Sequence, residues 1–268
     1  MAVVPQNQQN PLVDRDGVRL TVDGAVATVT LTVAARRNAQ TPAMWRALTE
    51  AGRALPGSVR IVVLRAEGVS FSAGLDRRAF TAEGIDGDIS FLTLARATDA
   101  DLDATIASFQ EAFTWWRRND LVSVAAVQGH AIGAGFQLAL ACDLRICAAD
   151  AQFAMRETSL GLVPDLGGTK PLVELVGYGR ALEICATGRA VQAAEAERIG
   201  LANLVVAPDE LPAATADLVA ALLAAPRDAV IETKALLRAA SGQDYDTQRA
   251  TERAAQARRL RDLADVVR

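Results

Sequence analysis

The chain has 268 residues, of which 51% are hydrophobic and 22% are charged. This composition supplies enough apolar surface for a buried core and excludes wholesale disorder. The 28 basic and 32 acidic side chains give a net charge of −4, which argues against a surface built to bind nucleic acid or an anionic membrane.

The sequence also indicates a protein of a reducing compartment. No apolar run reaches the ~18 residues that span a bilayer, and the first ten residues lack the pattern of a secretory leader. Cys142, Cys147 and Cys185 follow no disulfide or zinc spacing, and the single histidine makes a His-based metal site improbable. We therefore expect a cytoplasmic protein with no bound metal and with free thiols that behave as small hydrophobes.

The first part of the chain combines a polar segment with an alternating pattern. Residues 1–16 are polar, contain two prolines and indicate a loose tail. Period-two alternation in residues 25–32 predicts a half-buried strand, and the apolar run 61–64 predicts a strand covered on both faces. Between these strands, the Thr41-Pro42 pair supplies the N-cap and first residue of a helix.

Strands and helices continue to alternate after a loop rich in Gly, Asp and Ser, which covers residues 68–90. A helix is predicted at 101–117, and a strand at 122–127 leads into the glycine-rich turn 129–135. A second strand–loop–helix unit starts at Leu144 and passes through a further Gly-Gly turn. This order is typical of βαβ units and predicts an α/β fold with a parallel sheet.

No strand is predicted after residue 206, and three helices follow at 210–225, 227–238 and 246–267. The sequence therefore divides into a tail (1–16), a core (17–206) and a helical C-terminal region (207–268). We expect the helical region to pack on the core or on another subunit.

Generic catalytic motifs fit this chain poorly. A dinucleotide fingerprint needs a glycine at position 138, where the chain has Leu138. Neither Lys170 nor Lys234 lies in a phosphate-binding loop, and no G-x-S-x-G elbow is present. A Ser-His-Asp triad would need His130, which as a lone histidine in a glycine-rich turn is more often structural.

Two glycine-containing turns remain as candidate sites. One is Phe71-Ser-Ala-Gly-Leu-Asp76, and the other is Gly133-Ala134-Gly135 at the start of a helix. Small residues let a ligand approach the backbone, and a helix N-terminus presents unpaired N–H donors. Donors that converge from two such turns form an oxyanion hole.

Four segments, in this order along the chain, resemble the crotonase (enoyl-CoA hydratase/isomerase) superfamily, a likeness that runs from Val18 into the C-terminal helices. They are Arg37-Asn38-Ala39, the two turns above with the second extended back to Gly129, and Leu160-Gly-Leu-Val-Pro-Asp-Leu-Gly-Gly-Thr169. The resemblance implies a crotonase-like spiral of ββα turns and a helical C-terminal region used in trimerisation. It also implies a homotrimer or a dimer of trimers that takes an acyl-CoA thioester as substrate and uses no separate cofactor.

The same resemblance assigns roles to individual residues. The backbone N–H groups of Leu75 and Ala134 are expected to hold the enolate oxygen of the thioester. The residues assigned to the CoA part of the substrate are Arg37, Ala73, Asp76, Arg77 and Lys234. For Arg77 and its neighbour Arg78 two interpretations stay open, contact with the CoA phosphates or a place in a solvated loop.

The acid–base residues depart from the hydratase pattern, in which two glutamates share one water. The first glutamate position is Gln137 here, and the second is Glu157. A glutamine amide cannot accept a proton as a general base, so ordinary hydration is expected to be impaired. Asp165 falls where isomerases of the family can carry an acidic residue.

Glu157 and Asp165 are therefore the expected catalytic pair, one removing a proton and the other returning it as a double bond shifts. Apolar walls formed by Leu160, Leu162 and Leu166 are expected to raise the pKa of the carboxyl groups. Structural interpretations stay open for each polar residue: an N-cap for Asp165, a surface or ion-paired carboxylate for Glu157, and an ordinary helix residue for Gln137.

Three functions follow from these residues. The leading one is enoyl-CoA isomerisation through an enolate. The alternatives are weak or atypical hydration or thioester hydrolysis by Glu157 alone, and acyl-CoA binding without turnover. Exchange of the proton next to the thioester carbonyl separates enolate chemistry from simple binding.

Overall fold

The computed structural model describes residues 10–85 and 87–266. Its main layer is a seven-stranded sheet of order β1-β2-β3-β4-β5-β7-β10. The first three strands pair antiparallel, and the pairs from β3 to β10 are parallel. The strands are β1 (Val13–Arg15), β2 (Val18–Asp23), β3 (Val26–Leu31), β4 (Ile61–Ala66), β5 (Val122–Val127), β7 (Leu144–Ala148) and β10 (Leu204–Val206).

A second, three-stranded sheet of order β6-β8-β9 stands beside the main one. Its strands are β6 (His130–Ile132), β8 (Gln152–Ala154) and β9 (Val191–Gln192). β5 belongs to the first sheet, β6 to the second, and helix α4 (Ala134–Ala141) follows both. This strand–strand–helix unit is the repeat expected of the crotonase-like spiral, and the predicted α/β class is confirmed.

The apolar strands of the main sheet are covered on both faces, as predicted for β4. Because side chains alternate along a strand, Val62 and Leu64 join one hydrophobic cluster while Ile61 and Val63 join another. The first cluster includes α1 (Pro42–Ala54), which begins at the predicted Thr41 N-cap, with Thr41 Oγ1 3.1 Å from the Met44 N–H. The second includes residues of α8 (Leu211–Ala224).

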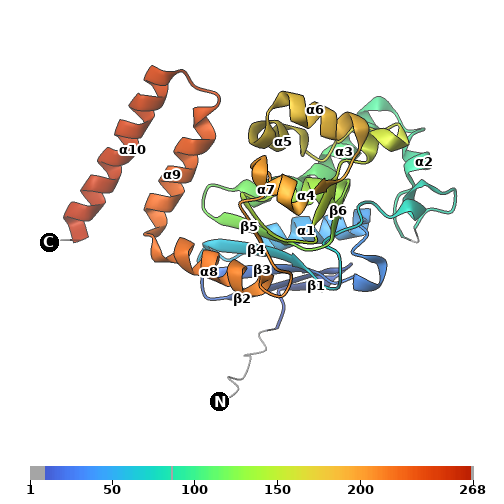
Figure 1. Cartoon of the computed structure of the whole chain (residues 1–268), viewed down its shortest axis with the longest axis horizontal. Helices are drawn as coiled ribbons and strands as arrows, with labels where there is room; N and C mark the ends of the chain where they lie inside the picture. The colour runs from blue at the N-terminus through green and yellow to red at the C-terminus, as the bar shows by residue number, and fades with distance from the viewer. Residues whose placement is uncertain (1–9, 86, 267–268) are drawn as a thin grey trace, which may run out of the picture.

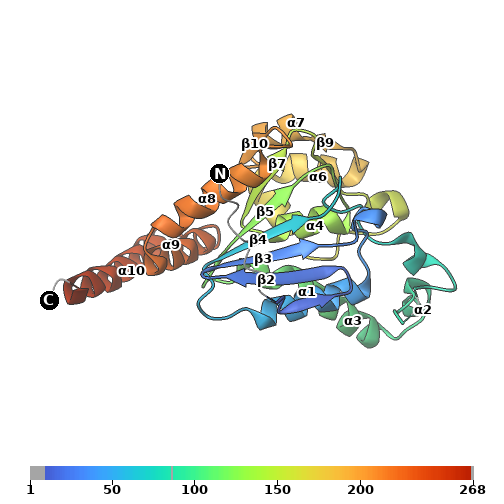
Figure 2. The same cartoon turned by 90° about the horizontal axis from the view of Figure 1, so that it is seen from below.

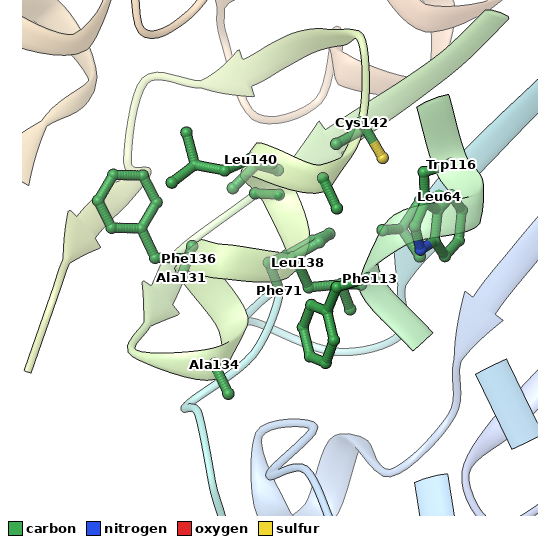
Figure 3. Packing of buried hydrophobic residues seen from close by; sticks show 14 of the residues in the cluster. Leu64, Phe71, Phe113, Trp116, Ala131, Ala134, Phe136, Leu138, Leu140 and Cys142 are labelled. Atoms are coloured by element: carbon green, nitrogen blue, oxygen red, sulfur yellow. The ribbon is translucent and has the colours of Figure 1, made fainter. Parts of the chain in front are cut away.

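Helices α3 (Asp99–Thr114), α5 (Thr169–Val176), α6 (Tyr178–Thr187) and α7 (Ala193–Arg198) surround the spiral, and a short helix α2 (Phe91–Leu94) precedes α3 (Figure 1). All eight residues of α4 are buried. Figure 3 shows its side chains leaving in different directions, Phe136 on one side and Leu138 on another, where Phe71 and Phe113 also lie. A helix that is buried on every side, with Gln137 as its one polar side chain, belongs inside the core.

The C-terminal region differs from the compact core. After α8, helices α9 (Arg227–Ala240) and α10 (Tyr245–Val266) form a hairpin that projects from the body of the molecule, on the side away from α2 (Figures 1 and 2). The hairpin carries strongly exposed apolar side chains at Leu237, Tyr245, Leu260 and Leu263. The predicted helical region after residue 206 begins where β10 ends.

Lys234 of α9 connects this hairpin to the core of the molecule. Its Nζ donates to the carbonyls of Arg118 and Leu121, each at 2.7 Å, and to Asp143 Oδ2 at 2.6 Å. An ammonium group has three N–H donors, so all of its capacity is used. These bonds leave no free donor on the Lys234 ammonium group for a phosphate in this structure, and the assignment of Lys234 to CoA binding stays a prediction.

Two other expectations need correction or refinement. Part of the predicted tail is ordered, because Val13–Arg15 pair with Val18–Leu20 and Val13 is buried; residues 1–9 lie outside the described part of the chain. The thiols of Cys142 and Cys147 are buried as expected, and burial raises the pKa of each to about 12, while Cys185 is half-buried. In the described residues, no helix is long and apolar enough to cross a membrane.

Replacement of Lys234 tests the anchor. We expect Lys234→Met to lower the free energy of unfolding by about 3 kcal/mol, because it leaves Asp143 and two carbonyls without their buried partner. CoA affinity, measured by calorimetry, is expected to stay unchanged. Lys170→Met serves as the control, since the exposed Lys170 only pairs with Glu174. Weaker CoA binding at unchanged stability contradicts the anchoring role.

Candidate active site

The turn that carries Leu75 is held by the segment that precedes α1. Gln40 N donates to Gly74 O at 2.7 Å, and Asp76 N donates to Gln40 O at 2.8 Å. These two bonds bracket Leu75, which pairs with Gln40 as an isolated parallel bridge. In such a bridge the N–H of the bracketed residue points away from its partner. In the described part of the chain, the Leu75 N–H has no backbone or side-chain acceptor.

On its other side the same turn lies against β6. Ser72 N donates to His130 O at 2.7 Å, and Ile132 N donates to Ser72 O at 3.0 Å. Gly74 has a φ of +86°, and a Cβ atom there would lie 2.5 Å from Ile132 O and 3.7 Å from Ala134 N. Glycine is therefore required at this position, both for its backbone angle and for the close approach to the next turn.

The second turn begins α4 directly beside the first. Gly133 precedes the helix with a φ of +52°, and Ala134 is its first residue, so the Ala134 N–H has no acceptor within the helix. A Cβ atom on Gly135 would lie 2.7 Å from Ser72 Cβ. The structure thus brings the two predicted turns into direct contact, although they are 60 residues apart in sequence.

Gln137 lies one turn further along α4 with its side chain buried. Its Oε1 accepts from Leu166 N at 2.9 Å and from Gly168 N at 3.3 Å, and its Nε2 donates to Glu157 Oε1 at 2.7 Å. Because backbone N–H groups only donate, the amide oxygen must face them and the NH₂ group must face Glu157. Gln137 is therefore in direct contact with Glu157 and is more than an ordinary helix residue.

Glu157 is the first residue of a 3₁₀ turn, η4 (Glu157–Leu160), that follows β8. Its Oε1 lies 3.4 Å from the position that a Cβ atom on Gly133 would occupy, so the carboxyl group is next to the start of α4. Its Oε2 is buried and has no hydrogen-bond partner in the described structure. Burial raises the pKa of Glu157, the nearby charge of Asp165 adds to this, and the bond from Gln137 opposes it.

Asp165 lies in the loop between η4 and α5. Burial raises the pKa of its carboxyl group too. The backbone oxygen of Asp165 accepts from Gln110 Nε2 at 2.6 Å, which ties the loop to α3. The N-cap position of α5 is Gly168, without a side-chain cap, so the interpretation of Asp165 as a cap is wrong.

The expected apolar enclosure is only partly present. Leu166 is buried, but Leu160 and Leu162 are 62% and 43% exposed. Leu160 and Leu162 are thus turned toward the surface, and of the three expected leucines only Leu166 is buried. No arginine or lysine in the described residues forms a salt bridge with Glu157, so the ion-paired interpretation of this residue is not supported.

The remaining CoA-assigned residues surround the first turn. Arg37 and Ala73 are exposed and joined by a bond from Ala73 N to Arg37 O of 2.8 Å, and Arg77 is exposed beside them. Asp76 is different, because its buried carboxylate caps the 3₁₀ turn η2 (Arg77–Phe80) and accepts from Arg78 Nη2 at 2.8 Å. The Asp76 side chain thus holds the turn, and Arg78 is not a freely solvated residue.

Arg36 also reaches Asp76, at 3.3 Å, and was not among the residues singled out from sequence. Sequence reasoning likewise missed the buried polar side chains of Gln40 and Ser72 behind the turn. His130 is structural, as expected, with Nδ1 3.1 Å from Ser70 Oγ. Within residues 10–85 and 87–266, no cluster of three His, Cys, Asp or Glu side chains is arranged to hold a metal ion.

Comparison with solved structures extends the likeness to the whole fold. A Thermobifida fusca YX protein crystallised in complex with CoA is 53% identical, with a TM-score of 0.88 over 93% of this chain and 95% of that one. An enoyl-CoA hydratase from Mycobacterium smegmatis is 30% identical, with a TM-score of 0.80 over 92% and 91% of the two chains.

Sequence comparison agrees. Methylglutaconyl-CoA hydratase 1, mitochondrial, of Pyricularia oryzae is 39% identical over 189 residues, which are 68% of this chain and 49% of that protein. This chain thus spans about half the length of that relative. The family model for enoyl-CoA hydratase/isomerase matches residues 21–263. The chain therefore belongs to the enoyl-CoA hydratase/isomerase family.

Proposed function

We propose that this protein acts on an acyl-CoA thioester and moves a double bond along the acyl chain through an enolate. The observation that carries the proposal is the state of Glu157. One carboxyl oxygen is occupied by Gln137, while the other is buried, unpartnered and next to the start of α4. A desolvated carboxylate with a free oxygen and a raised pKa is suited to proton transfer.

The thioester oxygen is placed between the N–H groups of Leu75 and Ala134. An α-proton leaves a thioester readily only if hydrogen bonds stabilise the enolate oxygen, and one such donor contributes about 3–4 kcal/mol to the transition state. The Leu75 N–H points away from Gln40, and the Ala134 N–H opens a helix, so both are available in the described structure. The contact of Gly74 with Ile132 and Ala134 keeps the two donors close.

The direction of the reaction follows from the acid–base groups. One carboxyl group removes a proton from a 3-enoyl thioester at C2, and the electron pair spreads over a dienolate. The other, in its protonated form, returns a proton at C4, which leaves the double bond between C2 and C3; a proton then passes from the first carboxyl group back to the second. Glu157 and Asp165 are close enough for the charge of one to raise the pKa of the other. Gln137 activates no water, because its amide cannot take up a proton.

Hydration is the second candidate, and the names of the relatives favour it, since the Mycobacterium smegmatis and Pyricularia oryzae proteins are both called hydratases. In that reaction Glu157 serves alone. Thioester hydrolysis by Glu157, and acyl-CoA binding without turnover, are the other outcomes that the tests below separate.

CoA is proposed to lie along the exposed side of the first turn, where Arg37, Ala73 and Arg77 are accessible. Support comes from the complex of the Thermobifida fusca relative with CoA. We also propose that the protein is a homotrimer or a dimer of trimers. The projecting α9–α10 hairpin supports this, because its apolar side chains, such as Leu237 and Leu260, are left exposed in a single copy.

Carboxyl-to-amide changes test the proton shuttle. We expect Glu157→Gln to slow α-proton exchange in deuterated buffer by about 100-fold or more, because it removes the base. Asp165→Asn is expected to preserve exchange and to abolish the shift of the double bond, followed by ultraviolet absorbance with 3-enoyl-CoA. Asp209→Asn, at an exposed carboxyl group outside the site, is the control. Full isomerisation by Glu157→Gln excludes the mechanism.

The pH dependence tests the bond from Gln137 to Glu157. Only ionised Glu157 accepts a proton, so the exchange rate falls as pH drops through its pKa, which burial places above the ordinary glutamate value. The Gln137 donor stabilises the ionised form. Gln137→Met should therefore move the acid limb of the exchange rate to still higher pH. An acid limb that stays at the same pH in this variant, or moves to lower pH, contradicts this role of Gln137.

A glutamate at position 137 tests the hydratase alternative. The N–H groups of Leu166 and Gly168, which now bind the amide oxygen, are equally suited to a carboxylate. We expect Gln137→Glu to raise water addition to crotonyl-CoA above the wild-type rate, measured by loss of enoyl absorbance. Gln137→Met controls for the loss of the amide alone. Equal hydration rates in wild type and Gln137→Glu show that a missing second carboxylate is not what limits hydration.

A further inference from the structure

We infer that a buried group of three side chains, Gln40, Trp45 and Ser72, positions the two backbone donors, with Ser72 as the residue that touches both turns. We refer to these three side chains as the Ser72 brace. The inference rests on the proposed function, since it concerns the same thioester-binding turns. It assigns Ser72 and Gln40 as positioning residues for the Leu75 and Ala134 N–H groups.

The main-chain N–H of Gln40, the residue whose side chain belongs to the brace, controls the direction of the Leu75 N–H. In a trans peptide the C=O of one residue and the N–H of the next point in opposite directions. The bond from Gln40 N to Gly74 O therefore fixes the peptide unit that ends in the Leu75 N–H. With no side chain and a positive φ, Gly74 has no other restraint of its own on this peptide.

Ser72 fixes the preceding peptide. Its Oγ accepts from Gly74 N at 3.2 Å and from Gln40 Nε2 at 3.2 Å, and it donates to Asn38 O at 2.8 Å. One hydroxyl group has a single proton and two acceptor positions, so this set uses its full capacity. The residue is completely buried.

The orientation of the brace is set from α1. Trp45 Nε1 donates to Gln40 Oε1 at 2.7 Å, and an indole N–H can only donate. The Gln40 amide oxygen must therefore face Trp45, and its NH₂ group must face Ser72. The Trp45 ring in turn packs against Phe109 and Phe113 of α3, with ring centroids 4.8 and 5.9 Å apart. The brace thus connects the α1–α3 core to the Leu75 turn.

Ser72 also sets the distance to the second turn. Its backbone is hydrogen-bonded to β6. Its side chain lies against the first turn of α4, where a Cβ atom on Gly135 would be 2.7 Å from Ser72 Cβ and 2.9 Å from Ser72 Oγ. A movement of Ser72 therefore changes the position of Leu75 and Ala134 relative to one another. Backbone donors cannot be removed by substitution, but their supports can.

The test uses the full chain and a conjugated dienoyl-CoA, whose absorbance moves to longer wavelength when hydrogen bonds polarise the thioester carbonyl. Ser72→Ala keeps a small side chain and removes the three bonds. We expect the absorbance band of dienoyl-CoA bound to this variant to lose most of the red shift that it shows in the wild-type protein. We also expect kcat for α-proton exchange to fall by about 10- to 100-fold with KM unchanged, because donor misplacement is felt in the transition state.

Ser70→Ala is the matched control. Ser70 is two residues earlier and equally buried, and its hydroxyl bonds His130 of β6, outside the segments 71–76 and 133–135 that carry the two donors. This variant should keep the wild-type red shift even if it is less stable. The acid limb of the pH profile should stay in place in Ser72→Ala, because none of the Glu157 contacts is altered.

An unchanged red shift in folded Ser72→Ala overturns the inference, whatever happens to the rate. If the wild-type protein binds the dienoyl-CoA without any red shift, the proposed oxyanion hole itself is wrong, and that result is distinct from a failure of the brace. If Ser72→Ala does not fold, Gln40→Leu carries the same readout, because it keeps Ser72 and its bond to Asn38 and removes the link to Trp45.

Discussion

The contact between two backbone turns is the constraint on which the site depends. Gly74 approaches Ile132 and Ala134 so closely that no side chain fits between them, and Gly135 does the same against Ser72. These contacts join a segment that follows β4 to a helix that follows β6. The arrangement of the strands brings the turn after β4 and the start of α4 together, and Gly74 and Gly135 allow their backbones to come into contact. Every chemical role proposed for this protein requires that arrangement.

The amide at position 137 sets the electrostatics around Glu157. Two carboxylates 2.7 Å apart would have to share a proton, and their titrations would be coupled. A neutral amide in a fixed orientation donates instead, so Glu157 keeps one occupied and one free oxygen. Asp165, in a loop that Gln110 ties to α3, is the acidic group whose charge raises the pKa of Glu157. The site thus contains one carboxylate with a free, buried oxygen.

Sequence patterns predicted the elements whose periodicity or capping is strong. The Thr41 cap, the apolar β4 and β5, and the three C-terminal helices lie where expected. β1 was missed, because its three residues sit in a polar, proline-containing segment and gain order only by pairing with β2. The site residues Glu157 and Asp165 came from the family likeness. The bonds of Lys234 to the carbonyls of Arg118 and Leu121 and to the Asp143 carboxylate could not be predicted, because these partners lie far earlier in the chain and no local pattern reveals them.

Helix α4 gives the molecule one more property. It is only eight residues long, is buried along its whole length, and begins with the Ala134 amide that we propose as one of the two oxyanion donors. A change in the packing around α4 therefore also changes the position of the Ala134 N–H. A substitution at a buried residue such as Leu138 would therefore disturb the position of the Ala134 N–H as well as the packing of the core.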